Sequence, residues 1–170
     1  MRKTYLFSRS LLSLSVIAAT FTPSLPAKAQ FDNGASLTAE VSALRNKTGQ
    51  VCFSLFDSGK GFPNNAEAIV DTQCVSAENY AEAADAEATT ESEAVIAVTF
   101  ESLPLGTYAV SVFHDENEDG EINRGGFGIP LEGFGFSQNP AITTRAPEFS
   151  ETAIIVVGSE TTTEIELIYY

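Results

Sequence analysis

Residues 96–112 read Ile96-Ala-Val-Thr-Phe-Glu-Ser-Leu-Pro-Leu-Gly-Thr-Tyr-Ala-Val-Ser-Val112, and their pattern indicates the fold class. Apolar side chains alternate with small or polar ones in both halves, over 96–100 and over 108–112. A period of two places one face of a β-strand in a core and the other face in water. Leu103-Pro-Leu-Gly106 lies between the halves and supplies a turn. The stretch therefore predicts two consecutive strands.

The rest of the chain repeats this pattern. Further strands are predicted at 37–43, 51–55, 153–157 and 165–169, and a weaker apolar run at 68–75 could add a seventh. No segment carries a strong amphipathic helix pattern. We therefore predict an all-β fold, a single antiparallel β-sandwich of about seven strands.

The first 29 residues have the order of a secretory signal peptide. A basic start over 1–9 precedes an apolar run over 11–21, and Ala27-Lys-Ala29 places small residues before Gln30. A membrane span needs about 20 apolar residues, so this run is too short to be an anchor. We predict cleavage before Gln30, export to the periplasm or the extracellular space, and a single domain over 30–170 that does not insert into a membrane.

The chain is strongly acidic. Its 170 residues hold 23 Asp and Glu against 9 Lys and Arg, which gives a net charge of −14. Residues 30–170 keep 5 of the basic side chains and all 23 acidic ones, so their net charge is −18. Such a surface repels phosphate backbones, which excludes nucleic-acid binding, and attracts cations. The 44% of hydrophobic residues exclude global disorder.

Cys52 and Cys74 are the only cysteines. Export to an oxidising compartment favours a disulfide between them. A redox-active pair usually has close C-x-x-C spacing, and a zinc site needs four ligands, so a structural disulfide is the better interpretation.

Two segments depart from the strand pattern. Residues 76–94 are rich in alanine and acidic side chains without an apolar stripe, which indicates a solvated, flexible loop. Residues 115–147 form a long stretch rich in Gly and Asn, and long ordered loops are often functional.

The second segment opens with the spacing of a calcium loop. Asp115-Glu-Asn-Glu-Asp-Gly-Glu-Ile-Asn123 places oxygen side chains at positions 1, 3, 5 and 9, with Gly at position 6. The closing Glu at position 12 is missing, but Glu132 could fold back and replace it. The candidate ligands are Asp115, Asn117, Asp119, the Glu121 carbonyl, Asn123 and Glu132. Structural Ca²⁺ is one hypothesis, and the alternative is a polar turn held by bonds from side chains to the backbone.

Three other side chains are candidates for function. His114 is the only histidine, but no nucleophile signature accompanies it, so a strand-end histidine bonded to loop backbone is favoured over a catalytic one. Phe134 and Phe136 lie among glycines in the long loop. They could form a ligand platform or pack over the end of the sandwich, and packing is favoured.

Several motifs together resemble a known family. They are Val51-Cys-Phe-Ser-Leu-Phe56, Gly61-Phe-Pro63, Phe100-Glu-Ser-Leu-Pro-Leu-Gly-Thr-Tyr-Ala-Val110, His114-Asp-Glu-Asn-Glu-Asp-Gly120 and Gly128-Ile-Pro-Leu-Glu-Gly-Phe-Gly-Phe-Ser137. Over residues 37–169 the chain resembles the exported bacterial family catalogued as domain of unknown function 2141. The Leu-Pro-x-Gly-x-Tyr segment also resembles transthyretin-like (prealbumin-like) and Ig-like modules. The resemblance implies an Ig-like sandwich and export, and it implies no activity.

Three functional hypotheses follow from the sequence. The favoured one is a non-enzymatic binding or envelope-associated module for an unknown protein or small molecule, with a calcium-stabilised loop. The second is a hydrolase that uses His114 and neighbouring carboxylates. The third is a purely structural or assembly module.

Overall fold

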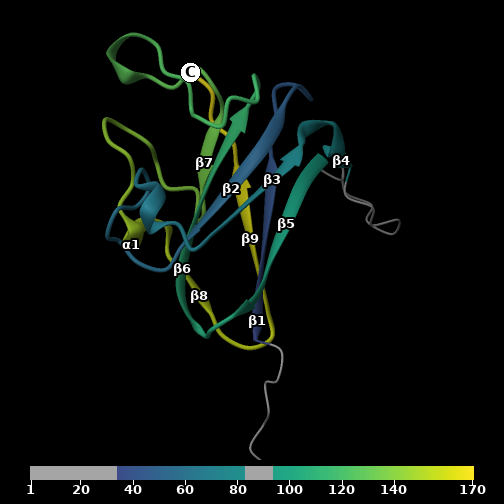
Figure 1. The fold of residues 1–170 in the computed structure, drawn as a ribbon, viewed down its shortest axis with the longest axis vertical. Coiled ribbons are helices and arrows are strands. Elements are labelled where there is room, and N and C mark those ends of the chain that lie inside the picture. Colours follow the sequence, from purple (N-terminus) through teal and green to yellow (C-terminus); the bar gives the residue numbers. More distant parts are fainter. Residues whose placement is uncertain (1–33, 83–93) are drawn as a thin grey trace, which may run out of the picture. The chain divides into compact units, whose positions relative to one another are not determined.

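Two β-sheets make up the domain in a computed structural model that describes residues 34–82 and 94–170 (Figure 1). The strands are β1 (Ala35–Ser42), β2 (Gln50–Phe56), β3 (Asp71–Ser76), β4 (Ala81–Glu82), β5 (Ala94–Leu103), β6 (Gly106–Asp115), β7 (Phe134–Phe136), β8 (Ile154–Val156) and β9 (Glu160–Glu166). The helical elements are η1 (Ala66–Ala68), η2 (Ala77–Asn79), η3 (Gly126–Gly128) and α1 (Phe149–Thr152). The predicted signal peptide lies outside the described residues. None of the described helices is long and apolar enough to cross a membrane.

The first sheet has the order β4-β5-β1-β9. Buried and half-buried side chains alternate without a break along β1, as the period of two predicts. β1 pairs with β5 antiparallel but with β9 parallel, so the prediction of a wholly antiparallel sandwich was wrong at this pair. Because β1 and β9 are far apart in the sequence, no tight turn connects them, and an antiparallel arrangement is not required.

The second sheet has the order β3-β2-β6-β7, and β8 pairs with the beginning of β6. Cys52 on β2 lies directly opposite Cys74 on β3, and the two form the predicted disulfide. β5 and β6 follow each other through the turn at Pro104 and Leu105, as the sequence predicted.

The hydrophobic core lies between the two sheets. Its largest fully buried side chains include Phe53, Phe100, Leu37 and Leu55, and Val110 and Val112 contribute from β6. These are the alternate residues that the sequence pattern placed on the inner face of each strand. The side chains between them, on the opposite faces of β2 and β6, make other contacts.

The two sheets approach each other at both edges. After β9, Ile168 exchanges two backbone hydrogen bonds with Phe134 of β7, at 3.1 and 2.8 Å. At the other side, the Gln73 amide donates to the Thr99 carbonyl over 3.0 Å. These contacts provide hydrogen-bond partners for backbone N–H and C=O groups at the sheet edges, which would otherwise be unpaired.

Two predicted loops contain more structure than the sequence indicated. Residues 76–82 of the segment predicted as a flexible loop hold η2 and β4, with Ala77 fully buried. Residues 83–93 lie outside the described residues, so flexibility over 76–94 stays a prediction. The long loop over 115–147 contains β7, because Phe134-Gly-Phe136 finds a partner in β6. The two sheets agree with the predicted sandwich, whose Ig-like identity stays a prediction.

Candidate functional site

His114 lies at the end of β6 with its side chain fully buried. Its Nε2 is 2.7 Å from the Thr48 carbonyl oxygen, and its Nδ1 is 2.8 Å from the Tyr169 hydroxyl. A carbonyl only accepts, so Nε2 carries the hydrogen and, in the neutral ring, Nδ1 accepts from Tyr169. Both nitrogens are therefore occupied by structural hydrogen bonds, one of them to loop backbone.

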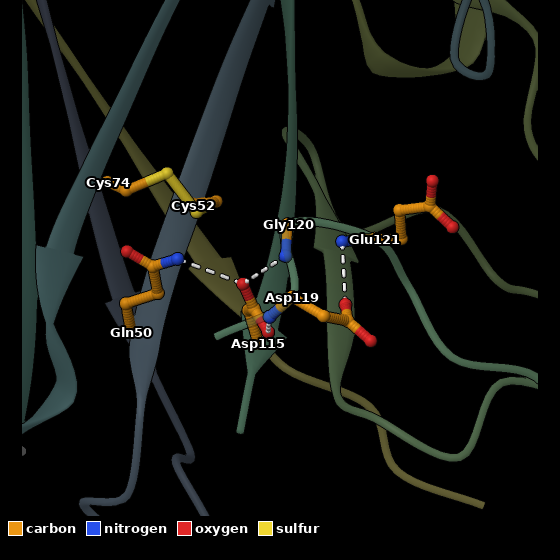
Figure 2. Close-up of a disulfide and its surroundings, with 7 residues drawn as sticks. All are labelled: Gln50, Cys52, Cys74, Asp115, Asp119, Gly120 and Glu121. Atoms are coloured by element: carbon orange, nitrogen blue, oxygen red, sulfur yellow. Dashed lines mark hydrogen bonds between the residues drawn. A yellow bond between two sulfur atoms is a disulfide. The ribbon is translucent and has the colours of Figure 1, made fainter. Parts of the chain in front are cut away.

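Asp115, the next residue, is also fully buried. Its carboxylate accepts from the Gln50 amide at 2.9 Å, the Asp119 backbone at 3.1 Å and the Gly120 backbone at 3.0 Å, and Figure 2 shows these donors around it. Gly120 has a φ of 79°, a left-handed conformation that the turn requires and that glycine adopts without strain. Asp115 thus closes the turn by binding backbone N–H groups.

Glu132 folds back onto the same loop, as the sequence suggested, with only 4% of its surface exposed. Its Oε1 accepts from the Glu116 backbone at 3.0 Å and its Oε2 from the Asn123 backbone at 2.8 Å. The loop is therefore stabilised by two buried carboxylates, Asp115 at its beginning and Glu132 beyond its end, which both accept hydrogen bonds from the loop backbone.

The exposed side of the loop is a network of amides around Asp119. Asn117 Nδ2 donates to Asp119 Oδ2 at 2.8 Å and to Asn123 Oδ1 at 3.0 Å, and Asn123 Nδ2 donates to Asp119 Oδ2 at 2.9 Å. The Glu121 backbone donates to Asp119 Oδ1, while the Glu121 side chain points away (Figure 2). The hydrogen bond from Asn123, followed by those from Glu121 and Asn117, lowers the pKa of Asp119.

The structure therefore brings the six calcium candidates into one loop, but mostly in the role of hydrogen-bond acceptors for N–H groups. Within residues 34–82 and 94–170, no group of three or more His, Cys, Asp or Glu side chains is arranged to hold a metal ion. Calcium binding by this loop stays a prediction.

An ion pair that the sequence did not reveal supports the loop. The Arg45 guanidinium donates to both carboxylate oxygens of Glu116, at 2.7 and 2.6 Å, and lies over the Tyr169 ring at 4.7 Å. The hydrogen bond from Arg45 is the main cause that lowers the pKa of Glu116. Arg45 and Glu116 are 71 positions apart, so no local pattern could have paired them.

A groove lies on the outer face of β6 and β7. Ser111 is paired with Phe136 and Phe113 with Phe134, and all four line the groove floor. The groove has a volume of about 540 Å³. The sequence had named Phe134 and Phe136 as candidates, and the structure places them in this floor with exposures of 7% and 9%.

Two chain segments form the groove walls. One is a hairpin in which Arg124 pairs with Pro130 and the Gly125 backbone donates to the Ile129 carbonyl at 2.8 Å. The other is the segment 142–146, which ends shortly before α1. Both belong to the long loop that separates β6 from β8, so the sequence located the segment but not the groove.

The charge of the groove differs from that of the chain. Over the described ranges 34–82 and 94–170, no Asp or Glu lines the groove, whereas Arg124 and Arg145 both line it. Arg145 donates to both carboxylate oxygens of Glu151, at 2.8 and 3.0 Å, which is the main cause that lowers the pKa of Glu151 to about 2. Arg124 donates to the Gly128 carbonyl at 3.1 Å. A site for an uncharged or anionic ligand with an apolar body fits this lining.

Comparison with known proteins identifies a family. A family model described as "Uncharacterized protein conserved in bacteria (DUF2141)" matches residues 39–164. No curated protein and no solved structure matches the chain. The matched range runs from β1 to β9 and includes the loop and every groove residue except Tyr170.

Proposed function

Because the chain belongs to the bacterial DUF2141 family, whose description assigns no activity, we propose a function from the geometry: a non-enzymatic binding module of an exported protein, with its ligand site in the groove over β6 and β7. The observation that carries the proposal is the groove itself. Its volume of about 540 Å³ lies within the range of small-molecule sites, and its lining combines aromatic side chains with a few polar groups.

Export is part of the proposal. It is supported by the basic start, the apolar run and the small residues before Gln30. The disulfide between Cys52 and Cys74 supports it further, because disulfides form and persist mainly in oxidising compartments. The periplasm and the extracellular space fit equally.

Binding is favoured over catalysis because the side chains of His114, Asp115 and Glu132 are buried and already hydrogen-bonded. A general base needs a free nitrogen or oxygen within reach of a substrate. The ring of His114 is fully buried with both nitrogens bonded, and the carboxylates of Asp115 and Glu132 are buried against backbone N–H groups. The hydrolase hypothesis would require these hydrogen bonds to break.

A neutral fluorescent dye tests the binding proposal. N-phenyl-1-naphthylamine is uncharged and becomes brighter when it leaves water for an apolar site. We expect saturable binding to the purified protein, and we expect Ser111→Trp to abolish it, because the indole would fill the groove floor. Thr107→Trp is the matched control, since Thr107 is exposed on the same face of β6 but outside the groove.

Two results would overturn the proposal. Either no saturable binding, or equal binding by both tryptophan variants, would remove the groove as a ligand site. The structural or assembly hypothesis would then be preferred. Calcium binding by residues 115–123 is a separate hypothesis that rests on oxygen spacing, and it is tested by chelation.

A further inference from the structure

We propose that the groove selects a small amphipathic monoanion, with an apolar body over the phenylalanine floor and one carboxylate or sulfonate group bound by Arg124. This inference rests on the proposed binding function and adds the chemical class of the ligand. It is carried by the charge and the apolar lining of the groove and by the contacts of its two arginines.

The distribution of charge is the first argument. Acidic side chains outnumber basic ones by 23 to 9 in the chain, yet the groove lining, as far as the structure describes the chain, holds two arginines and none of the acidic residues. Residues 30–170 contain only five basic side chains, so two of the five line this one groove. A cationic lining in an anionic protein is complementary to an anion and raises its local concentration.

The two arginines are not equivalent. Arg145 is engaged by both carboxylate oxygens of Glu151, which neutralises its charge locally. Arg124 is exposed, and within the described residues no carboxylate forms an ion pair with it. Its Nη1 donates to the Gly128 carbonyl, which fixes the guanidinium on the hairpin and leaves other N–H groups for a ligand. A guanidinium with free N–H groups binds two oxygens of a carboxylate or of a tetrahedral oxyanion through paired hydrogen bonds.

The apolar part of the lining defines the rest of the ligand. Phe113, Phe134 and Phe136 form the floor, and Phe127 and Ile129 stand at the rim. The Phe127 side chain is fully exposed at the tip of the hairpin, and Ile129 is 48% exposed. A ligand with an aromatic or branched apolar body would remove this surface from water.

A single negative charge fits better than several. Among the residues that the structure describes, the lining offers one guanidinium outside an ion pair, and the surrounding chain repels additional anionic groups because of its net charge of −14. Polyphosphates are therefore disfavoured, whereas a monocarboxylate or a monosulfonate meets one cation and an apolar floor.

Two dyes that differ by one group provide the test. 8-Anilino-1-naphthalenesulfonate has the ring system of N-phenyl-1-naphthylamine with a sulfonate added. We expect Arg124→Gln to weaken binding of the sulfonate dye by about 10-fold, the usual size of a lost charge-assisted hydrogen bond, and to change binding of the neutral dye by less than about 2-fold. Arg124→Lys should recover part of the loss, because it restores the charge without the paired geometry.

Lys47→Gln is the matched control. It removes one positive charge from an exposed residue outside the groove, so it changes the net charge as much as Arg124→Gln does. We expect it to leave both affinities unchanged. Competition against the neutral dye extends the test to carboxylates: 2-naphthoate should displace it more effectively than the uncharged 2-naphthamide.

The outcomes separate this inference from the function on which it rests. If Ser111→Trp abolishes neutral-dye binding but Arg124→Gln does not weaken the sulfonate dye, the groove is a ligand site and the anion preference is wrong. Equal effects of Arg124→Gln and Lys47→Gln would also contradict it, since they would show a nonspecific effect of charge. If neither dye binds in the groove, both proposals fail.

Discussion

The Tyr169 hydroxyl lies 2.8 Å from His114 Nδ1, and this bond joins the end of β6 to the segment that follows β9. The same hydroxyl accepts from the Arg45 backbone at 3.3 Å, and His114 donates through Nε2 to the Thr48 carbonyl. The hydrogen bonds therefore run in one direction from Arg45 through Tyr169 and His114 to Thr48. This chain ties both sheets to the loop between β1 and β2, beside the candidate calcium loop.

Tyr169→Phe should lower the free energy of unfolding by about 1 kcal/mol, because it removes the hydroxyl and leaves His114 Nδ1 without its partner. Urea denaturation measures the change. Tyr170→Phe is the matched control, since the Tyr170 side chain is 63% exposed and its ring contacts with Phe134 are preserved. Equal effects of the two substitutions would show that the buried hydrogen bond contributes nothing.

The contact between Gly133 and Tyr169 gives a second prediction. A Cβ atom at Gly133 would overlap the Tyr169 ring, so Gly133→Ala must displace the tyrosine and should cost about 1–3 kcal/mol of stability. Gly126→Ala is the control, because a Cβ there would meet no atom within 4 Å. Denaturation of both variants in urea would test the close packing, and a Gly133→Ala protein as stable as the control would contradict it.

The ion pair between Arg45 and Glu116 predicts a pH dependence. Because the Arg45 hydrogen bond lowers the pKa of Glu116 in the folded state, its contribution is present above the pKa of the unfolded chain. It is lost as the pH falls through the lower, folded-state value. We expect Glu116→Gln to cost about 0.5–1 kcal/mol at neutral pH, reduced by partial solvent screening.

This cost should shrink toward zero in strongly acidic solution, where the wild-type Glu116 is itself protonated. Unfolding free energies at neutral and acidic pH measure it. Glu118→Gln, which removes one negative charge from an exposed position in the same loop, is the control. A cost for Glu116→Gln that stays constant with pH would show that the ion pair is not its source.

The strands could be predicted because their signal is local. Alternation over a few residues fixes which side chains face the core, and β1, β2, β5 and β6 formed where it occurs. The last strand was placed too late, because β9 covers Glu160–Glu166 and not the predicted 165–169. Parallel and antiparallel partners require the same alternation, so the parallel pairing of β1 with β9 left no signal. β7 was missed because Phe134-Gly-Phe136 is short and becomes a strand only by pairing with β6.

The candidate site was predictable only in part, for the same reason. The oxygen spacing of residues 115–123 is local, and it located a loop that Asp115 and Glu132 hold together. The groove depends on residues that the fold brings together from distant positions, such as Ser111, Arg124 and Arg145. No periodicity marks those positions. The cysteine pairing was the exception among distant contacts, because two cysteines allow only one intramolecular disulfide.

Removing the disulfide should destabilise the protein by about 3 kcal/mol, since a bridge across a separation of 22 residues restricts the unfolded chain. Cys52→Ala combined with Cys74→Ala, measured by urea denaturation, tests this value. The reduced wild-type protein should lose a similar amount. A double variant as stable as the oxidised protein would show that the pairing of β2 with β3 alone determines stability in this region.

The calcium hypothesis makes the last prediction. If the loop binds Ca²⁺, the ion must replace N–H donors around Asp119, which requires the Asn117 and Asn123 amides to turn their oxygens inward. Excess Ca²⁺ should then raise the melting temperature over that in a chelator, with a gain of about 2.7 kcal/mol at a concentration 100 times Kd. Asp119→Asn should remove the gain, whereas Glu118→Gln, outside the ligand set, should keep it. An unchanged melting temperature of the wild type would contradict calcium binding, and equal gains in both variants would indicate general screening of an acidic surface by the cation.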